Sequence, residues 1–119
     1  MVITKNIDKL KRKSPFPGNI EKAINLLIKV YKPLDIYIFG SYAWGVPDSE
    51  SDVDFLITVK DSDEKNYLRP IKGLKALKGL NVPKDILVLT SDELRDQLKH
   101  PSSLFRKIHE KGIKVYESS

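Results

Sequence analysis

Three short apolar segments, separated by helical patterns, constrain the fold of this chain more than any other feature of its sequence. They span residues 35–39, 52–59 and 85–89, and each is rich in β-branched or aromatic residues. Segments of this length and composition, bounded by Gly, Pro or polar residues, are typical of buried strands. Residues 113–116 have a similar pattern and are expected to form a terminal strand or bridge.

Apolar residues recur at helical spacing before and between these segments. The first predicted helix begins after Asn19, an expected N-cap, and stops at Pro33. Pro70 and Gly73 are expected to make the helix predicted over about 65–79 imperfect or kinked. The remaining predicted helices span 41–44, a short segment opened by capping-box spacing at 90–93, and 101–111. The order of elements predicts an α/β (or α+β) domain, in which a mixed β-sheet is flanked by helices on one side.

The length of 119 residues suits one domain. We expect residues 1–18 to form a basic N-terminal lead-in that closes on the structure-breaking run 15–18, and residues 19–117 to form the folded domain. The basic run 9–13 is interpreted first as a solvated tail or exposed turn, and second as an arm that contacts phosphate.

The composition excludes several kinds of site. The chain has no cysteine, which excludes disulfides, thiolate zinc sites and a cysteine nucleophile. His100 and His109 alone cannot form an all-nitrogen zinc site, so any metal would be held mostly by carboxylates, as Mg²⁺ and Mn²⁺ are. No apolar run approaches the ~20 residues of a membrane span, and the first residues lack a secretory pattern, so we expect a cytoplasmic protein. The net charge of +5 fits a polyanionic partner, although lysine-rich solubility explains it equally well.

The end of the first predicted strand carries a pattern suited to binding phosphate. Gly40 and Ser41 lie between a strand and a helix, where backbone N–H groups and a hydroxyl are available to phosphate oxygens. Asp52 and Asp54 are two residues apart on the next strand, so both side chains project from one face and can share hard cations. Asp85 opens the third strand and is a candidate third carboxylate or general base toward an incoming hydroxyl.

Each of these signals has a simpler interpretation when it is taken alone. Two acids near a strand start are usually solvent-facing, and a single strand-end acid such as Asp85 is more often structural than a ligand. The context of Asp54 favours a site, because it lies where the apolar run 55–57 begins and an unpaired acid there would be costly. The combination predicts a site that grips a triphosphate and holds divalent metal during nucleotidyl transfer.

The same residues and their neighbours resemble the signature of the DNA polymerase β-like nucleotidyltransferases. The matching runs are 40–45 and 51–56, with ten residues between Ser41 and Asp52. More narrowly, the chain is similar to the minimal nucleotidyltransferases, the stand-alone catalytic domains that include antitoxins of the MntA type. The resemblance covers about residues 20–117 and includes parts of the carboxy-terminal third. Because the motif is specific and the coverage long, we expect membership of this superfamily.

This resemblance implies a polymerase β-like palm with defined site residues. Gly40 and Ser41 would bind the triphosphate of ATP or another NTP, and Asp52, Asp54 and Asp85 would ligate Mg²⁺ (or Mn²⁺). The implied reaction is transfer of a nucleoside monophosphate, AMP from ATP, to a hydroxyl of a partner macromolecule. Many minimal members pair with an all-helical HEPN-type protein and, as antitoxins, transfer AMP to one of its tyrosines, so a HEPN-type partner is expected and a membrane is not.

Two other functions stay open at this point. The absence of a visible acceptor-binding lobe leaves a non-catalytic nucleotide-binding or partner-binding subunit, which acts by contact, as the alternative. Modification of a small molecule is disfavoured for the same reason. A homo-oligomer is also considered, because the apolar residues of the helix expected over 65–79 offer a surface for self-association.

Several other residues have a functional and a structural interpretation. Arg95 and His100 have the Arg-x4-His spacing of HEPN ribonucleases, but the expected fold is not all-helical, so we interpret them as a surface residue and a helix-end residue. Tyr42 and Trp44 are candidates to stack on a base or to pack beside the glycine turn.

Lys60 and Arg69 are candidates for phosphate contact, with a solvated face as the preferred interpretation. Phe105, Ile108 and Tyr116 are interpreted as core residues.

Overall fold

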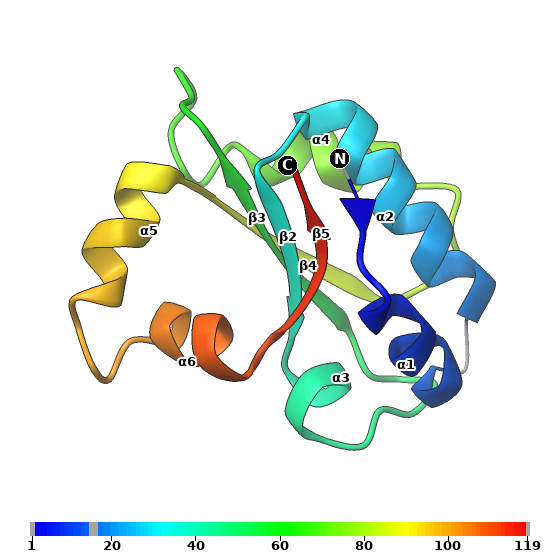
Figure 1. Ribbon diagram of the computed structural model, residues 1–119. Helices are drawn as coiled ribbons and strands as arrows, with labels where there is room; N and C mark the ends of the chain where they lie inside the picture. Colours follow the sequence, from blue (N-terminus) through cyan, green and yellow to red (C-terminus); the bar gives the residue numbers. More distant parts are fainter. Residues whose placement is uncertain (1, 15–16, 119) are drawn as a thin grey trace.

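The computed structural model describes residues 2–14 and 17–118, and the expected structure-breaking residues 15 and 16 lie outside this part of the chain. Its centre is a twisted five-stranded sheet in the order β1-β5-β2-β3-β4 (Figure 1). Among the strands of the described residues, only β3 and β4 pair in parallel and the other pairs are antiparallel, so the expected mixed sheet is confirmed. The strands are β1 (Val2–Ile3), β2 (Asp35–Phe39), β3 (Val53–Val59), β4 (Lys84–Thr90) and β5 (Ile113–Glu117).

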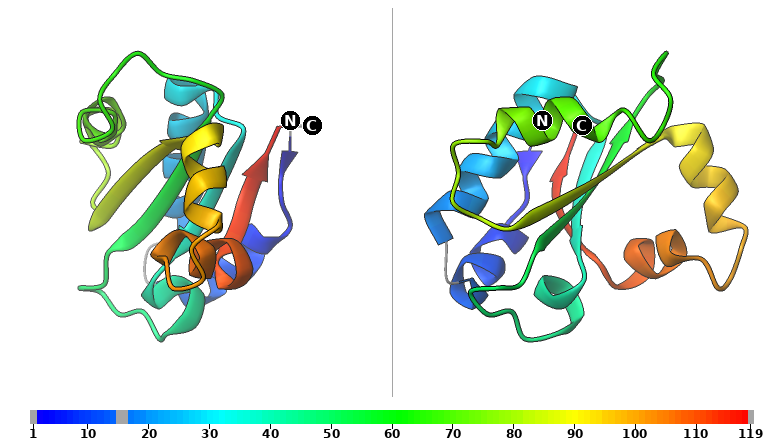
Figure 2. Two further views of the ribbon diagram at one scale, coloured as in Figure 1. Left: turned by 90° about the vertical axis from the view of Figure 1, so that its left-hand side faces the viewer. Right: turned by 180° about the vertical axis from the view of Figure 1, so that it is seen from behind.

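Helices cover both faces of this sheet, and the expectation of helices on one side is wrong. One face packs against α1, α2 and α4, and the other faces α5 and α6 (Figure 2). The physical reason is that β3 is apolar on both faces: Phe55 and Ile57 join the first core cluster, and Leu56 joins a second cluster with Ile108 of α6. The helices are α1 (Asn6–Lys13), α2 (Pro17–Tyr31), α3 (Ser41–Trp44), α4 (Pro70–Ala76), α5 (Ser91–Leu98) and α6 (Leu104–Lys111).

The described part of the expected lead-in is packed against the rest of the protein. β1 pairs with β5, where Ile3 lies opposite Tyr116. Ile7 and Leu10 of α1 are buried in the first core cluster. The basic run 9–13 therefore lies in a helix with one buried face, and its interpretation as a solvated tail or exposed turn is wrong. The cause is the apolar spacing of residues 7 and 10, which puts both side chains on the same side of α1.

Helix α4 is shorter than the helix expected over 65–79. Residues 66–69 form a turn, and Pro70 is the first helical residue, so the proline starts the helix rather than kinking it. Gly73 lies against α2, where its N–H donates to the Tyr31 hydroxyl at 3.0 Å. A Cβ atom at Gly73 would lie 2.7 Å from that hydroxyl oxygen, so the missing side chain is what lets α4 approach α2.

The other helix ends follow local capping chemistry. The predicted capping box is confirmed: the Glu93 N–H donates to Thr90 Oγ1 at 3.2 Å, and the Thr90 N–H donates to Glu93 Oε1 at 2.8 Å. Helix α6 begins at Leu104 with Ser103 as its N-cap, three residues later than expected, and Gly112 ends it as predicted. No helix in the described ranges is long and apolar enough to cross a membrane.

Candidate active site

The turn between β2 and α3 depends on a glycine for two reasons. Gly40 has φ 73° and ψ −147°, a backbone conformation that other residues rarely adopt. A Cβ atom on Gly40 would also lie 2.2 Å from Oδ2 of Asp54, well inside contact distance. The absence of a side chain thus lets the glycine turn lie directly against the Asp54 carboxylate.

The strand register brings the candidate residues to one end of the sheet. Phe39, the residue before Gly40, lies opposite Asp54 in the antiparallel β2–β3 pair. Asp54 in turn lies opposite Asp85 in the parallel β3–β4 pair. Neighbouring strands are about 4.8 Å apart, so the two aspartates are immediate neighbours across the ladder. Asp52 is exposed and precedes the first residue of β3.

The alternation of side chains puts both strand aspartates on the α5/α6 face. Leu56 and Leu87, each two residues further along its strand, belong to or pack against the second core cluster on that face. Residues 53, 55, 57 and 59 belong to the first core cluster, so the two faces of β3 pack against different clusters. The Ile86 N–H donates to Asp85 Oδ1 at 3.0 Å, which orients this carboxyl group.

At this end of the sheet, the negative charges of Asp52, Asp54 and Asp85 oppose one another. Burial, then the charge of Asp85, then that of Asp52 raise the pKa of Asp54 from 3.8 to about 6. A carboxyl group in this position gains from a cation, because a positive charge offsets both the desolvation and the neighbouring negative charges. The donor set, oxygen ligands only, suits a hard divalent cation such as Mg²⁺ or Mn²⁺.

The carboxylates of Asp52, Asp54 and Asp85 interact electrostatically, but their side chains do not converge on one metal position. Within residues 2–14 and 17–118, no three acidic or histidine side chains already converge as a metal-binding group. The residues present fit a divalent cation, because they supply oxygen ligands and because the pKa of Asp54 is raised by its surroundings. Ligation by Asp52, Asp54 and Asp85, and triphosphate binding by Gly40 and Ser41, stay predictions.

The aromatic side chains beside the glycine turn have different roles. Tyr42 is fully buried in the first core cluster and is a packing residue. Trp44 is 37% exposed, and its ring centroid lies 6.3 Å from that of Phe39. The Nζ of Lys107 in α6 lies 4.3 Å from the Trp44 ring centroid, which places a positive charge next to α3. Sequence reasoning missed Lys107, because only the packing of α6 on the sheet brings it here.

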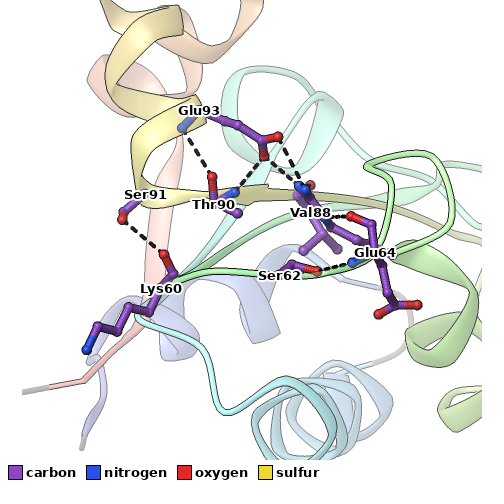
Figure 3. A network of polar contacts seen from close by, with 8 residues as sticks. Lys60, Ser62, Glu64, Val88, Thr90, Ser91 and Glu93 are labelled. Carbon is purple, nitrogen blue, oxygen red and sulfur yellow. Dashed lines mark hydrogen bonds and ion pairs between the residues drawn. The ribbon is translucent and has the colours of Figure 1, made fainter.

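Arg69 is not part of a solvated face, so that interpretation is wrong. It is 6% exposed, and it donates to the backbone carbonyl oxygens of Glu64 at 3.1 Å and Val88 at 3.3 Å, besides pairing with Glu93. The hydrogen bond from Arg69 is the largest cause that lowers the pKa of Glu93. Arg69 therefore ties the loop before α4 to the start of α5. Lys60 is exposed, and its side chain extends away from this network (Figure 3).

The remaining interpretations agree with the structure. Arg95 is exposed and pairs with Asp92 at 2.9 Å, and His100 is exposed just after the end of α5. Ile108 and Tyr116 are buried, and Phe105 packs against the second core cluster.

Comparison with known proteins identifies the family. The model of the nucleotidyltransferase domain family matches residues 20–115. A chain of a toxin–antitoxin complex crystallised with AMP-PNP is similar in structure, with a TM-score of 0.55, 24% identity, and coverage of 83% of this chain and 73% of that one. A mutant of the toxin–antitoxin MntA-HpeT matches with a TM-score of 0.54, 20% identity, and the same shares of the two chains, 83% and 73%.

A structure from Sulfolobus solfataricus named as a nucleotidyltransferase has a TM-score of 0.60 and 19% identity, and covers 98% of this chain and 92% of its own. None of the curated proteins matches the sequence. The shared fold confirms the expected architecture, and the family match extends over nearly the whole chain with Gly40, Asp54 and Asp85 inside it. This chain therefore belongs to the nucleotidyltransferase domain family.

Proposed function

We propose that this chain is a Mg²⁺-dependent nucleotidyltransferase that transfers AMP from ATP to a hydroxyl group of a partner macromolecule. The observation that carries the proposal is the contact of Gly40 with Asp54, which lies next to Asp85 across the β3–β4 ladder. Together these residues provide a glycine turn for phosphate and a carboxylate pair that gains from a cation. Family membership supports nucleotidyl transfer as the reaction class.

Each residue of the site has a separate proposed role in nucleotidyl transfer. The N–H groups at the start of α3 and the Ser41 hydroxyl would donate to the triphosphate, since the first residues of a helix have N–H groups without intrahelical partners. Asp52, Asp54 and Asp85 would hold Mg²⁺ or Mn²⁺. The cation, when bound, neutralises charge on the phosphates and on the attacking oxygen.

Asp85 is the proposed general base. The acceptor hydroxyl would give its proton to the Asp85 carboxylate as its oxygen bonds to the α-phosphorus. The bond from that phosphorus to the oxygen bridging the α- and β-phosphates would break, and pyrophosphate would leave. Asp85 suits this role because it is exposed at the edge strand β4, where an acceptor can approach it.

The partner is proposed to be a protein, and specifically a HEPN-type toxin for which this chain is the antitoxin. Two of the similar structures are chains of toxin–antitoxin complexes, one of them crystallised with AMP-PNP. Their likeness to this chain in fold supports an ATP-like nucleotide and a protein acceptor. Lys107 beside Trp44 supports a polyanionic substrate at the same end of the sheet.

The test is transfer of label from α-labelled ATP, with Mg²⁺, to the protein that co-purifies with this chain. Replacing both metal candidates, Asp52→Asn with Asp54→Asn, should lower transfer at least about 100-fold. The matched control is Asp61→Asn with Asp63→Asn, which removes two exposed carboxylates of the same spacing at the far end of β3. Transfer that survives in the first double variant would refute the assignment of the site.

The alternative is a subunit that acts on its partner by contact alone. The observation that favours it is an apolar surface on and before α4, where Tyr67 is 68%, Leu68 40%, Ile71 45% and Leu74 39% exposed. Such a surface suits a protein interface or self-association. Two results together would establish contact as the function. The double variant Asp52→Asn with Asp54→Asn would still bind and neutralise the partner. The double variant Ile71→Asp with Leu74→Asp would lose both binding and neutralisation.

A further inference from the structure

A concave surface lies at the end of the sheet opposite to Gly40 and Asp54. It has a volume of about 640 Å³, within the range of about 300–1,000 Å³ that is typical of small-molecule sites. Its walls include Ile28, Pro33, Leu34 and Tyr116, where the end of α2 meets the start of β2 and the end of β5. We call this surface the distal hollow.

Three lysines line the distal hollow, and none of them is neutralised. Lys29, Lys32 and Lys60 are exposed, and no ion pair or side-chain hydrogen bond engages any of them within the described residues. In contrast, Lys114 on β5 pairs with Asp35 at 3.5 Å. An apolar cavity edged by three unpaired positive charges is complementary to a molecule with an apolar body and an anionic head.

Lys32 ends α2 in a left-handed backbone conformation. Among the described residues it is the single non-glycine residue with positive φ, at 47°, and its N–H donates to the Ile28 carbonyl oxygen at 2.9 Å to end α2. A left-handed conformation costs an ordinary residue roughly 1–2 kcal/mol, which glycine would avoid. The Lys32 side chain lines the hollow.

Three backbone groups around the hollow, the N–H and carbonyl of Leu34 and the carbonyl of Lys60, are already hydrogen-bonded. The Leu34 N–H donates to the Thr58 carbonyl oxygen at 2.8 Å, and the Leu34 carbonyl oxygen accepts from the N–H and the hydroxyl of Ser118 at 2.8 and 3.1 Å. The Lys60 carbonyl oxygen accepts from the Ser91 hydroxyl at 3.4 Å. Strand-like peptide binding needs free backbone groups, and these three groups of Leu34 and Lys60 are not free for it.

We propose that the distal hollow binds a small amphipathic anion, an aliphatic or aryl chain that ends in a carboxylate. The chain would pack against Ile28, Leu34 and Tyr116, and the head group would lie among the three lysines. Lys60 is six residues beyond Asp54 on β3, so the two sites are roughly 20 Å apart. The ligand would therefore bind without competing with a nucleotide, and the inference goes beyond the proposed function.

Decanoate is the probe, titrated into the isotopically labelled protein and followed by two-dimensional NMR of the backbone amides. We expect saturable shifts near residues 28–34, 60 and 116–118, and none at Gly40, Trp44 or Asp85. Decyltrimethylammonium, with the same tail and a positive head, should bind at least about 10-fold more weakly, because its charge opposes the lysines.

Two variants test the role of the lysines. Lys32→Gly should weaken decanoate binding about 3-fold without loss of stability, since glycine relieves the positive φ. The triple variant Lys29→Gln, Lys32→Gln and Lys60→Gln should weaken it about 30-fold if the three contributions add.

The matched control is Lys22→Gln with Lys75→Gln and Lys78→Gln, which removes the same charge from exposed sites outside the hollow and should leave binding unchanged. Equal binding of the cationic amphiphile, shifts outside the hollow, or no saturable binding of decanoate would overturn the proposal. Tighter binding of a short acidic peptide with a Leu-Phe centre would also overturn it, in favour of a protein ligand.

Discussion

Replacing Gly40 by alanine tests the geometry of the candidate site most directly. The change adds one methyl group at a residue with φ 73°, where that methyl carbon would lie 2.2 Å from Asp54 Oδ2. The two consequences are separable. The backbone conformation affects the free energy of unfolding, and the overlap affects the position of the Asp54 carboxylate.

The expected magnitudes follow from these two effects. A non-glycine residue held in a sparsely populated backbone region costs roughly 1–3 kcal/mol, which for a domain of this size lowers Tm by roughly 4–15 °C. Because Oδ2 is the far end of the Asp54 side chain, the overlap is relieved when that carboxylate rotates away. A displacement of about 1 Å in a reacting group lowers activity about 100-fold. Gly40→Ala should therefore lose most transfer activity even at temperatures where it is fully folded.

Thermal unfolding and AMP transfer at 20 °C, measured on the same preparation, check both expectations. Gly18→Ala is the control, because a Cβ atom there meets nothing within 4 Å and the residue lies in α2. It should keep full activity and the same or a slightly higher Tm. An unchanged Tm together with full activity in Gly40→Ala would show that this turn does not constrain Asp54.

Three further predictions concern charge and capping. The folded state binds the Asp54 proton more tightly than the unfolded state, since its pKa is raised from 3.8 to about 6, so stability should fall as pH rises from about 4 to about 6. Across this range, stability measured by urea unfolding should fall more with pH in the wild type than in Asp54→Asn; identical slopes would contradict this prediction. Arg69→Met should cost roughly 2–4 kcal/mol in urea unfolding, because it removes the cation that pairs with Glu93 and the donor to the Val88 carbonyl oxygen. Arg95→Met should stay within about 0.5 kcal/mol, since its ion pair is exposed. Equal effects of the two arginine variants would remove Arg69 from its structural role. Thr90→Ala should cost about 1 kcal/mol by breaking the capping box, and no change in stability would show that Glu93 alone sustains the start of α5.

Local patterns in the sequence were sufficient for much of the fold. Residues 35–39 and 41–44 form the predicted strand and helix with the predicted bounds, because each is delimited by Gly40 or Gly45. The capping box at 90–93 was also readable, since its two hydrogen bonds join residues three apart. The start of α4 was missed because Pro70 is equally compatible with a kink and with a first helical residue, and only packing against α2 decides between them.

The sequence by itself determined which residues could do chemistry. The glycine turn and the two aspartates are local patterns, and their spacing is independent of the rest of the fold. Only the tertiary structure decided which of them meet: the register of β3 and β4 puts Asp85 beside Asp54, and the packing of α6 brings Lys107 to Trp44. Helices on both faces, the docking of α1 and the distal hollow likewise arise from contacts between segments far apart in the chain. Such contacts depend on burial and strand register, and these are properties of the whole fold rather than of any local run of residues.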